Sequence, residues 1–216
     1  LEKHFSCILI LLTIGASMMF LGGTDLKWFG YGAIAVGVFA FLYLKFMGYA
    51  SARVTAWRDP ASDPAGDGYQ ILQSLYAIGS GGLFGKGLLN ATQSGHGFLP
   101  EAQTDFIFCV LAEQFGFVGS MALLALYGAL IYVSMRIARN SNDLFGTLIV
   151  MCIVGMWLFQ ILENIGMDCG LMPITGIPLP FVSYGSTGMI MSFMALGLIG
   201  SVWRGSNIDK KKEGRL

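Results

Sequence analysis

Uncharged runs of mostly apolar residues, interrupted by short polar segments, make up much of the chain. A helix needs about 20 consecutive apolar residues to cross the hydrocarbon core of a bilayer. Five runs approach or reach this length, and they cover residues 4–24, 28–44, 114–135, 144–162 and 183–202. The pattern therefore predicts an all-α polytopic membrane protein with about five transmembrane helices.

The composition agrees with a membrane protein and excludes other classes. Of 216 residues, 55% are hydrophobic and only 12% are charged, whereas soluble domains carry about 25% charged residues. This apolar content is too high for a disordered chain. The 13 basic residues balance 13 acidic residues, so the chain offers no basic face for nucleic acid. The four cysteines have no metal-binding spacing.

The basic residues predict how the chain is oriented. Residues 210–212 and Arg215 are basic and follow the last predicted span, and short cytoplasmic segments hold an excess of Lys and Arg. We therefore expect a cytoplasmic C-terminus. Alternation of the spans then places residues 47–103 and 164–181 outside the cytoplasm.

These assignments predict the domain organisation. Residues 1–216 are expected to form one membrane domain, and the odd number of spans favours the C-terminal part of a longer chain. Residues 47–103 are expected to form a large extracytoplasmic loop that contains short helices. Within it, the glycine-rich stretch between Asp67 and Lys86 is interpreted as an interfacial or re-entrant segment rather than a sixth crossing.

A glycine-rich segment at residues 79–87 carries one cation, Lys86. Glycines let backbone N–H groups approach anionic oxygens, and a lysine adds a point charge. The spacing is not that of a Walker A loop, because Gly87 stands where that motif needs a hydroxyl. The segment is either an anion-binding loop or a flexible turn with a solvated lysine.

Two carboxylates follow in the segment from Phe98 to Phe108. Pro100 and Glu101 together resemble a helix start, so we expect a helix to begin near Pro100. Glu101 and Asp105 then lie one turn apart on one face, which raises the pKa of one of them. Such a pair suits proton transfer. The alternative is two acids that simply interact with the positive end of the helix dipole.

The third polar segment, residues 163–185, contains three prolines at the outer end of a predicted span. Irregular backbone at membrane depth must be buried in protein or line a wet cavity. Glu163 and Asn164 are candidates to face that cavity. The same residues would also fit a rigid turn that binds no ligand.

Three strings in this order carry a resemblance to a known family. They are GYQILQSLYAIGSGGLFGKGL at residues 68–88, FLPEAQTDFIF at 98–108 and ENIGMDCGLMPITGIPLPFVSYG at 163–185. Together they resemble the signature regions of the SEDS family (shape, elongation, division and sporulation), whose members include RodA, FtsW and SpoVE. The resemblance covers the C-terminal half of that family and favours the RodA branch. The chain departs from the family's usual pattern at Gln103 and at residues 183–188.

The resemblance implies a peptidoglycan glycosyltransferase of the bacterial cytoplasmic membrane. Such an enzyme polymerises lipid II into glycan strands for cell-wall elongation and cell shape, releases undecaprenyl diphosphate, and is partnered by a class B penicillin-binding protein. Asp105 matches the family's catalytic aspartate and is expected to act as the base. The residues expected to bind substrate are Lys86, Arg53, Arg58, Glu101, Gln103, Ser183 and Tyr184.

The sequence specifies no cofactor with certainty, and it leaves alternatives for the diphosphate-binding charge and for the function. Lys86, Arg53 and Arg58 are candidates to compensate the diphosphate charge, and a divalent cation, Mg²⁺ or Mn²⁺, is the alternative. A division role of the FtsW type is an alternative to elongation. A flippase or transporter of lipid-linked precursors is the main rival, but the middles of the five predicted spans lack ionisable residues, which a transporter commonly places there. A structural scaffold would not explain the charged loop.

Overall fold

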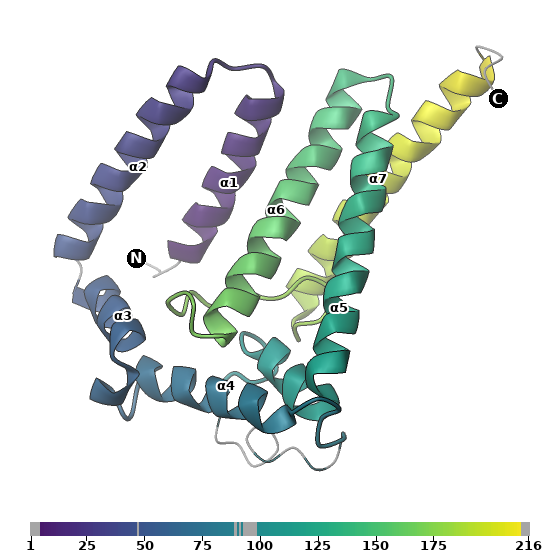
Figure 1. Cartoon of the computed structure of the whole chain (residues 1–216). Coiled ribbons are helices and arrows are strands. Elements are labelled where there is room, and N and C mark those ends of the chain that lie inside the picture. Colours follow the sequence, from purple (N-terminus) through teal and green to yellow (C-terminus); the bar gives the residue numbers. More distant parts are fainter. Residues whose placement is uncertain (1–4, 47, 89, 91, 93–98, 213–216) are drawn as a thin grey trace. The chain divides into compact units, whose positions relative to one another are not determined.

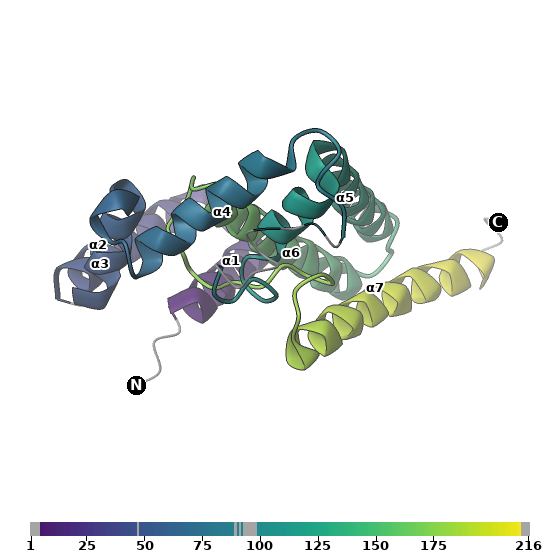
Figure 2. The same cartoon turned by 90° about the horizontal axis from the view of Figure 1, so that it is seen from below.

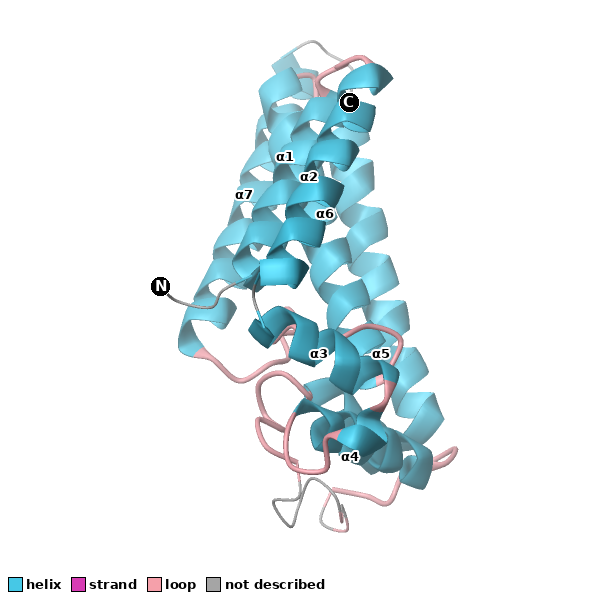
Figure 3. Ribbon diagram, turned by 90° about the vertical axis from the view of Figure 1, so that its left-hand side faces the viewer, coloured by secondary structure: helices cyan, strands magenta, loops and turns pink. Residues whose placement is uncertain are grey.

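The computed structural model describes all residues except 1–4, 47, 89, 91, 93–98 and 213–216. Over the described residues it contains helices, turns and loops but no strand (Figure 3). The predicted all-α fold is therefore confirmed. The helices, labelled in Figure 1, are α1 (Phe5–Leu21), α2 (Leu26–Phe46), α3 (Gly48–Arg58), the 3-10 helix η1 (Pro60–Ser62), α4 (Asp67–Gly81), α5 (Ile107–Arg139), α6 (Leu144–Asp168) and α7 (Ser186–Lys212).

Three of the described helices are long and apolar enough to cross a membrane. They are α5, α6 and the part of α7 from Ser186 to Asn207, and they coincide with the last three predicted spans. The chain is thus a multi-pass membrane protein. The first two predicted spans are helical, as α1 and α2, and α1 contains a shorter apolar stretch, Ile10–Met19. Their crossing of the membrane stays a prediction.

The helix expected to begin near Pro100 begins later, at Ile107, so that prediction is wrong. Residues 100–106 form turns, because Glu101 adopts a left-handed conformation with φ of 53°, which a continuous helix excludes. The Glu101 carbonyl accepts the N–H groups of Thr104 and Asp105, each at 3.1 Å. Glu101 and Asp105 therefore share a compact turn rather than one face of a helix.

Local signals explain the ends of α6. Asp143 precedes the helix, and its carboxylate accepts the N–H groups of Phe145 at 3.2 Å and Gly146 at 3.1 Å. This is the usual way in which an aspartate caps a helix N-terminus. At the other end Gly170 has φ of 70°, and Leu171 N–H bonds back to the Gly166 carbonyl at 2.8 Å. A left-handed glycine of this kind commonly ends a helix.

The glycine-rich segment after α4 docks on α5 through backbone atoms. Helix α5 is broken at Gly116, which has φ of 67°. A Cβ atom on Gly116 would collide with the Gly85 nitrogen, and one on Gly85 would collide with the Gln114 carbonyl. The N–H of Lys86 bonds to the Glu113 carbonyl at 3.0 Å. The glycines are therefore required for close contact between two stretches of backbone.

The chain forms two compact units. The first comprises Leu1–Thr24, Leu123–Ile161 and Pro180–Leu216, and the second comprises Asp25–Ala122 and Leu162–Leu179. The expected single membrane domain and the extracytoplasmic placement of residues 47–103 stay predictions.

Aromatic rings pack the first unit. Phe181 makes edge-to-face contacts with Trp157 and Phe193, at centroid distances of 5.3 and 5.5 Å. The Tyr127 hydroxyl donates a hydrogen bond to the Pro180 carbonyl. These contacts tie the segment before α7 to α5 and α6 within that unit.

The second unit has its own hydrophobic core, and α3 lies beside the first part of α4 in it (Figure 2). The core joins α4, the turn before α5, the start of α5, the end of α6 and the segment that follows α6. Its buried members are Ile71, Ala77, Leu99, Phe106, Cys109, Met167 and Ile174. Phe106 is 1% exposed, so it anchors the residue that precedes it, Asp105, at the edge of this core.

Candidate functional site

Asp105 lies half-buried in the turn that precedes α5, within the second unit. Its backbone carbonyl accepts a hydrogen bond from Asn164 Nδ2 at 2.7 Å. Its carboxylate lies against Gly176, where a Cβ atom would be 3.1 Å from Asp105 Oδ2. Asp105 is thus held by the end of α6 through its backbone, and its side chain lies against the segment that follows α6.

The surroundings of Asp105 alter its acidity. Burial raises the pKa of its carboxyl above the ordinary value of 3.8, and the negative charge of Glu101 raises it further. The Thr104 hydroxyl and the positive charge of Arg53 act in the opposite direction and lower the pKa. A carboxylate with a raised pKa is a better base than an exposed aspartate, so the site is suited to accepting a proton.

The irregular segment at residues 169–179 forms one wall of this site. Side chains from other elements bind its carbonyl groups: Trp57 Nε1 donates to Gly170 O at 2.9 Å, and Arg53 Nη1 donates to Ile174 O at 2.9 Å. The Thr175 hydroxyl bonds to Glu163 Oε1 at 2.6 Å. Buried backbone groups need such partners when no regular element supplies them. The segment is therefore a fixed wall.

Arg53 is the predicted substrate-binding cation that influences Asp105. Its Nε lies 3.4 Å from Asp67 Oδ2, and 28% of its side chain is exposed. It contacts the wall at Ile174 and lowers the Asp105 pKa through its charge. The Arg53 side chain, which belongs to α3, thus pairs with Asp67 of α4 and bonds to the wall, and its charge acts on Asp105.

Lys86 forms an ion pair with a buried acid. Its Nζ lies 3.0 Å from Glu113 Oε1, and the Glu113 side chain is 0% exposed. The same carboxylate oxygen accepts the Thr92 N–H at 2.8 Å, and Lys86 also donates to the Thr92 hydroxyl at 2.7 Å. The lysine is therefore engaged within the protein, and its predicted role toward a diphosphate stays a prediction.

The other predicted ligands have different surroundings. Arg58 is exposed at the last residue of α3, and Glu101 and Gln103 are exposed in the turn that carries Asp105. Ser183 is buried and Tyr184 is 74% exposed, and both belong to the first unit. The structure thus brings Arg53 and Glu101 into electrostatic range of Asp105. The roles of Arg58, Gln103, Ser183 and Tyr184 stay predictions.

Residues outside the predicted ligand set also shape the site. Gly176 has φ of 72° and lies against the Asp105 carboxylate. Asp168, which is fully buried, accepts the Cys109 N–H at 3.0 Å. The sequence does offer a signal for Asp168. It lies four residues after Asn164, so the two side chains share one face of a helix. No sequence signal identified Gly176 among the many glycines.

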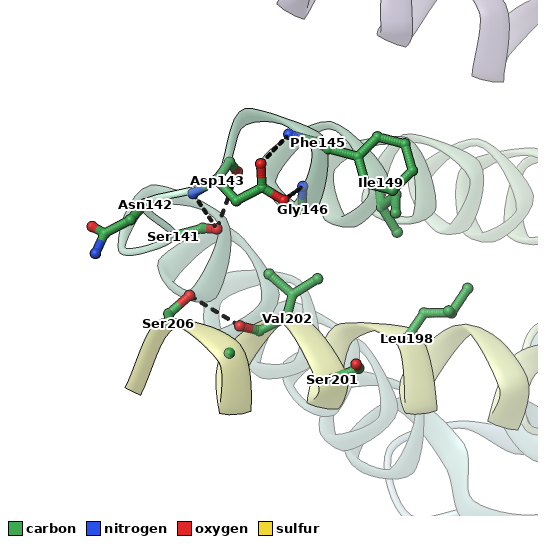
Figure 4. Close-up of a pocket in the computed structure, with 11 residues that line it drawn as sticks. Ser141, Asn142, Asp143, Phe145, Gly146, Ile149, Leu198, Ser201, Val202 and Ser206 are labelled. Atoms are coloured by element: carbon green, nitrogen blue, oxygen red, sulfur yellow. Dashed lines mark hydrogen bonds between the residues drawn. The ribbon is translucent and has the colours of Figure 1, made fainter. Parts of the chain in front are cut away.

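The described residues of the first unit line at least two cavities. One, of about 320 Å³, is formed by the turn at residues 141–143, the start of α6 and the second half of α7 (Figure 4). Asp143 in its lining is already engaged as the cap of α6. The other, of about 520 Å³, includes Arg136 and Trp203 in its lining. Neither is lined by Asp105.

Among the described residues, no three or more His, Cys, Asp or Glu side chains are arranged to hold a metal ion.

A half-buried carboxylate in a helical membrane protein, with a positive neighbour and a fixed wall of backbone, defines a site suited to proton transfer. The FtsW/RodA/SpoVE family, described as cell cycle protein, matches residues 1–208. The chain belongs to this family.

Relatives with assigned names extend the comparison. The chain is 42% identical to stage V sporulation protein E of Bacillus subtilis, over 87% of this chain and 51% of that protein. It is 42% identical to peptidoglycan glycosyltransferase MrdB of Escherichia coli K12, over 90% of this chain and 53% of that protein. A probable peptidoglycan glycosyltransferase FtsW of Thioalkalivibrio is also 42% identical, over 99% of this chain and 54% of that protein. The chain spans about half the length of these relatives.

A solved structure has the same fold. A chain of a peptidoglycan synthase complex, studied for how it coordinates polymerization and crosslinking, superposes with a TM-score of 0.75 and 31% identity. The match covers 94% of this chain and 56% of that chain. The identity to sporulation, FtsW and MrdB relatives is the same, so the predicted RodA branch stays a prediction.

Proposed function

We propose that the full-length protein containing this chain is a peptidoglycan glycosyltransferase that polymerises lipid II at the outer face of the bacterial cytoplasmic membrane. The observation that carries the proposal is Asp105, a half-buried carboxylate with a raised pKa beside the positive charge of Arg53. The names of relatives at 36–42% identity support it. Cell-wall elongation is the role we assign, with division of the FtsW type as the alternative.

In the proposed reaction, Asp105 acts as the general base. It takes the proton from the hydroxyl of the acceptor sugar while that oxygen attacks the anomeric carbon of the donor. The bond from that carbon to the diphosphate oxygen breaks, and undecaprenyl diphosphate leaves with the electron pair. No covalent sugar–enzyme intermediate is needed.

The leaving diphosphate needs positive charge as it forms. We assign this role first to Arg53, because its charge acts on Asp105. Lys86, Arg58 and a divalent cation are the alternatives. If polymerisation persists in EDTA, side chains supply the positive charge. If EDTA abolishes polymerisation and Mg²⁺ or Mn²⁺ restores it, a divalent cation supplies that charge.

A class B penicillin-binding protein is the proposed partner. The solved relative belongs to a peptidoglycan synthase complex, which supports association with a second component. Co-purification of the full-length protein with a tagged penicillin-binding protein tests the partner separately from the chemistry.

The test of the chemistry is Asp105→Asn in the full-length protein. Loss of a general base typically lowers the rate by about 100-fold to 10,000-fold, and purified protein incubated with lipid II should show that loss in glycan strands resolved on a gel. Asp25→Asn, the same change at an exposed aspartate, is the matched control and should keep full activity.

Two results would count against the proposal. Near-normal polymer from Asp105→Asn would remove the base assignment. Movement of labelled lipid II across vesicles by wild-type protein, without any polymer, would favour the transporter instead.

A further inference from the structure

The end of α6 presents two polar side chains to the backbone around Asp105. Asn164 and Asp168 are one helical turn apart and both are 0% exposed. Asn164 Nδ2 donates to the Asp105 carbonyl at 2.7 Å and to the Ile177 carbonyl at 2.9 Å. One amide group thus binds both the turn that carries Asp105 and the wall beside it.

Asp168 binds the first turn of α5. Its Oδ2 accepts the Cys109 N–H at 3.0 Å, one of the early helical N–H groups that the helix itself leaves without a partner. Asp168 therefore acts as an N-terminal cap supplied by another helix. The Ser74 hydroxyl donates to the Asp168 carbonyl at 2.6 Å and so connects this residue to α4.

These two contacts replace one helical hydrogen bond. In a helix extended backward from Ile107, the Cys109 N–H would donate to the Asp105 carbonyl, four residues earlier. Instead the N–H binds Asp168 and the carbonyl binds Asn164. Together with the left-handed conformation of Glu101, these contacts account for the start of α5 at Ile107, after the turn that carries Asp105.

The arrangement has a cost. Asn164 Oδ1 and Asp168 Oδ1 are buried and have no hydrogen-bond partner among the described residues. Buried polar atoms without partners destabilise a fold, so each of these side chains carries a cost beside the hydrogen bonds that it makes. Local cost of this kind is characteristic of residues retained for function.

We infer that Asn164 and Asp168 are positioning residues that keep Asp105 out of α5 and aim its carboxylate at the substrate. The inference rests on the proposed function, because it assigns these residues a role through Asp105. Without them α5 can extend through Asp105, and each residue added to a helix turns the next side chain by about 100°. The carboxylate would then leave its place against Gly176.

The test is made in full-length protein with Asn164→Leu, which removes both donors in a side chain of similar size. A misplacement of about 1 Å at a reacting group can cost about 100-fold in rate, so kcat should fall by about that factor. KM for lipid II should stay within about 3-fold, because no substrate contact is removed. Asn164→Ala serves the same purpose if the leucine variant does not fold.

Asp168 offers a conservative variant that separates hydrogen bonding from charge. The carboxamide oxygen of Asp168→Asn still accepts the Cys109 N–H, so kcat should stay within about 3-fold of the wild type. Asp168→Leu has no acceptor and should lose activity as Asn164→Leu does. Gln160→Leu, one turn earlier on α6, is the matched control and should keep wild-type kcat and KM.

A pH profile adds a measurement that a loss of folding alone would not change. Burial is the first cause of the raised Asp105 pKa, so a carboxylate released to water titrates at lower pH. The acid limb of the residual activity of Asn164→Leu should therefore move to lower pH than in the wild type.

The outcomes are distinguishable. A folded Asn164→Leu variant with wild-type kcat would overturn the inference, and so would a loss caused entirely by a higher KM. If Asp105→Asn is inactive while Asn164→Leu and Asp168→Leu are active, the inference fails and the proposed function stands. If Asp105→Asn is active, the proposed function fails, and positioning of a base fails with it.

Discussion

The two units differ in the reach of many of their side-chain hydrogen bonds, although Tyr127 of the first unit bonds to the Pro180 carbonyl and Ser120 of the second bonds within its own helix. In the first unit, serine hydroxyls bond to the carbonyl four residues earlier in their own helix, as Ser134, Ser192 and Ser206 do. In the second unit, polar side chains reach across long separations: Arg53 binds a carbonyl 121 residues away, and Ser74 binds one 94 residues away.

The difference follows from the backbone of each unit. A helix supplies its own hydrogen bonds, which a hydrocarbon environment demands, so its hydroxyls add little. The turn at Asp105 and the segment at residues 169–179 have no regular ladder, so distant side chains must supply the partners. Substitutions in the second unit should therefore disturb several segments at once, and those in the first unit should stay local.

The largest expected effect is at the ion pair of the second unit. Lys86→Met leaves the buried Glu113 carboxylate without its Lys86 partner, and breaking a buried pair in this way typically costs about 3–5 kcal/mol. The melting temperature of the full-length protein in detergent should fall accordingly.

The double variant Lys86→Met/Glu113→Gln sharpens this result. The Gln oxygen can still accept the Thr92 N–H, so most of the stability and activity should return if the lysine is structural. A stable double variant without activity would instead assign Lys86 to substrate, as the glycine-rich motif suggests.

A smaller effect is expected at the wall. Gly176→Ala forces a side chain into a left-handed conformation, which costs about 1–2 kcal/mol, and sets a Cβ atom 3.1 Å from Asp105 Oδ2. Polymerisation should fall by about 10-fold or more, because the base is displaced. Gly188→Ala in α7 meets no atom within 4 Å and should leave both stability and activity unchanged.

The hydroxyls test the comparison directly. Ser74→Ala leaves the Asp168 carbonyl without its donor in a buried position, and such a loss costs about 1–3 kcal/mol. Ser134→Ala removes a bond within one helix and should change the free energy of unfolding by less than about 0.5 kcal/mol. If thermal unfolding shows the same loss of stability for Ser74→Ala and Ser134→Ala, the difference between the units is contradicted.

The smallest effect is a shift in pH dependence. Asp105 works as an ionised base, so activity should decline as the pH falls through its pKa. The charge of Glu101 raises that pKa, and Glu101→Gln removes the charge. The acid limb of kcat should therefore move to lower pH, with little change at neutral pH. A shift to higher pH would contradict the electrostatic coupling.

Much of the fold could be predicted because it depends on local composition. The gaps between charges located α5, α6 and α7, since hydrocarbon excludes charges along a whole span. The start of α5 could not be predicted in this way. Pro100 and Glu101 give a local signal for a helix, but Asp168 and Asn164, which lie about 60 residues further along, determine where the helix begins.

The candidate site likewise combines features that the sequence displays with features that depend on the folded structure. Asp105, its coupling to Glu101 and the charge of Arg53 involve residue types that the sequence displays, so they could be proposed in advance. The partner of Lys86 is 27 residues away, and the role of Gly176 depends on a backbone angle and a contact. Such information exists only after the chain has folded.

The break at Gly116 divides the length of α5. At 1.5 Å per residue, an unbroken helix of 33 residues would extend about 50 Å, well beyond a hydrocarbon thickness of about 30 Å. The portion after Gly116 alone extends about 35 Å, which suffices for a crossing. The change of direction therefore removes the surplus turns from the transmembrane path, and the residues next to Asp105 need not share the tilt of the span they precede.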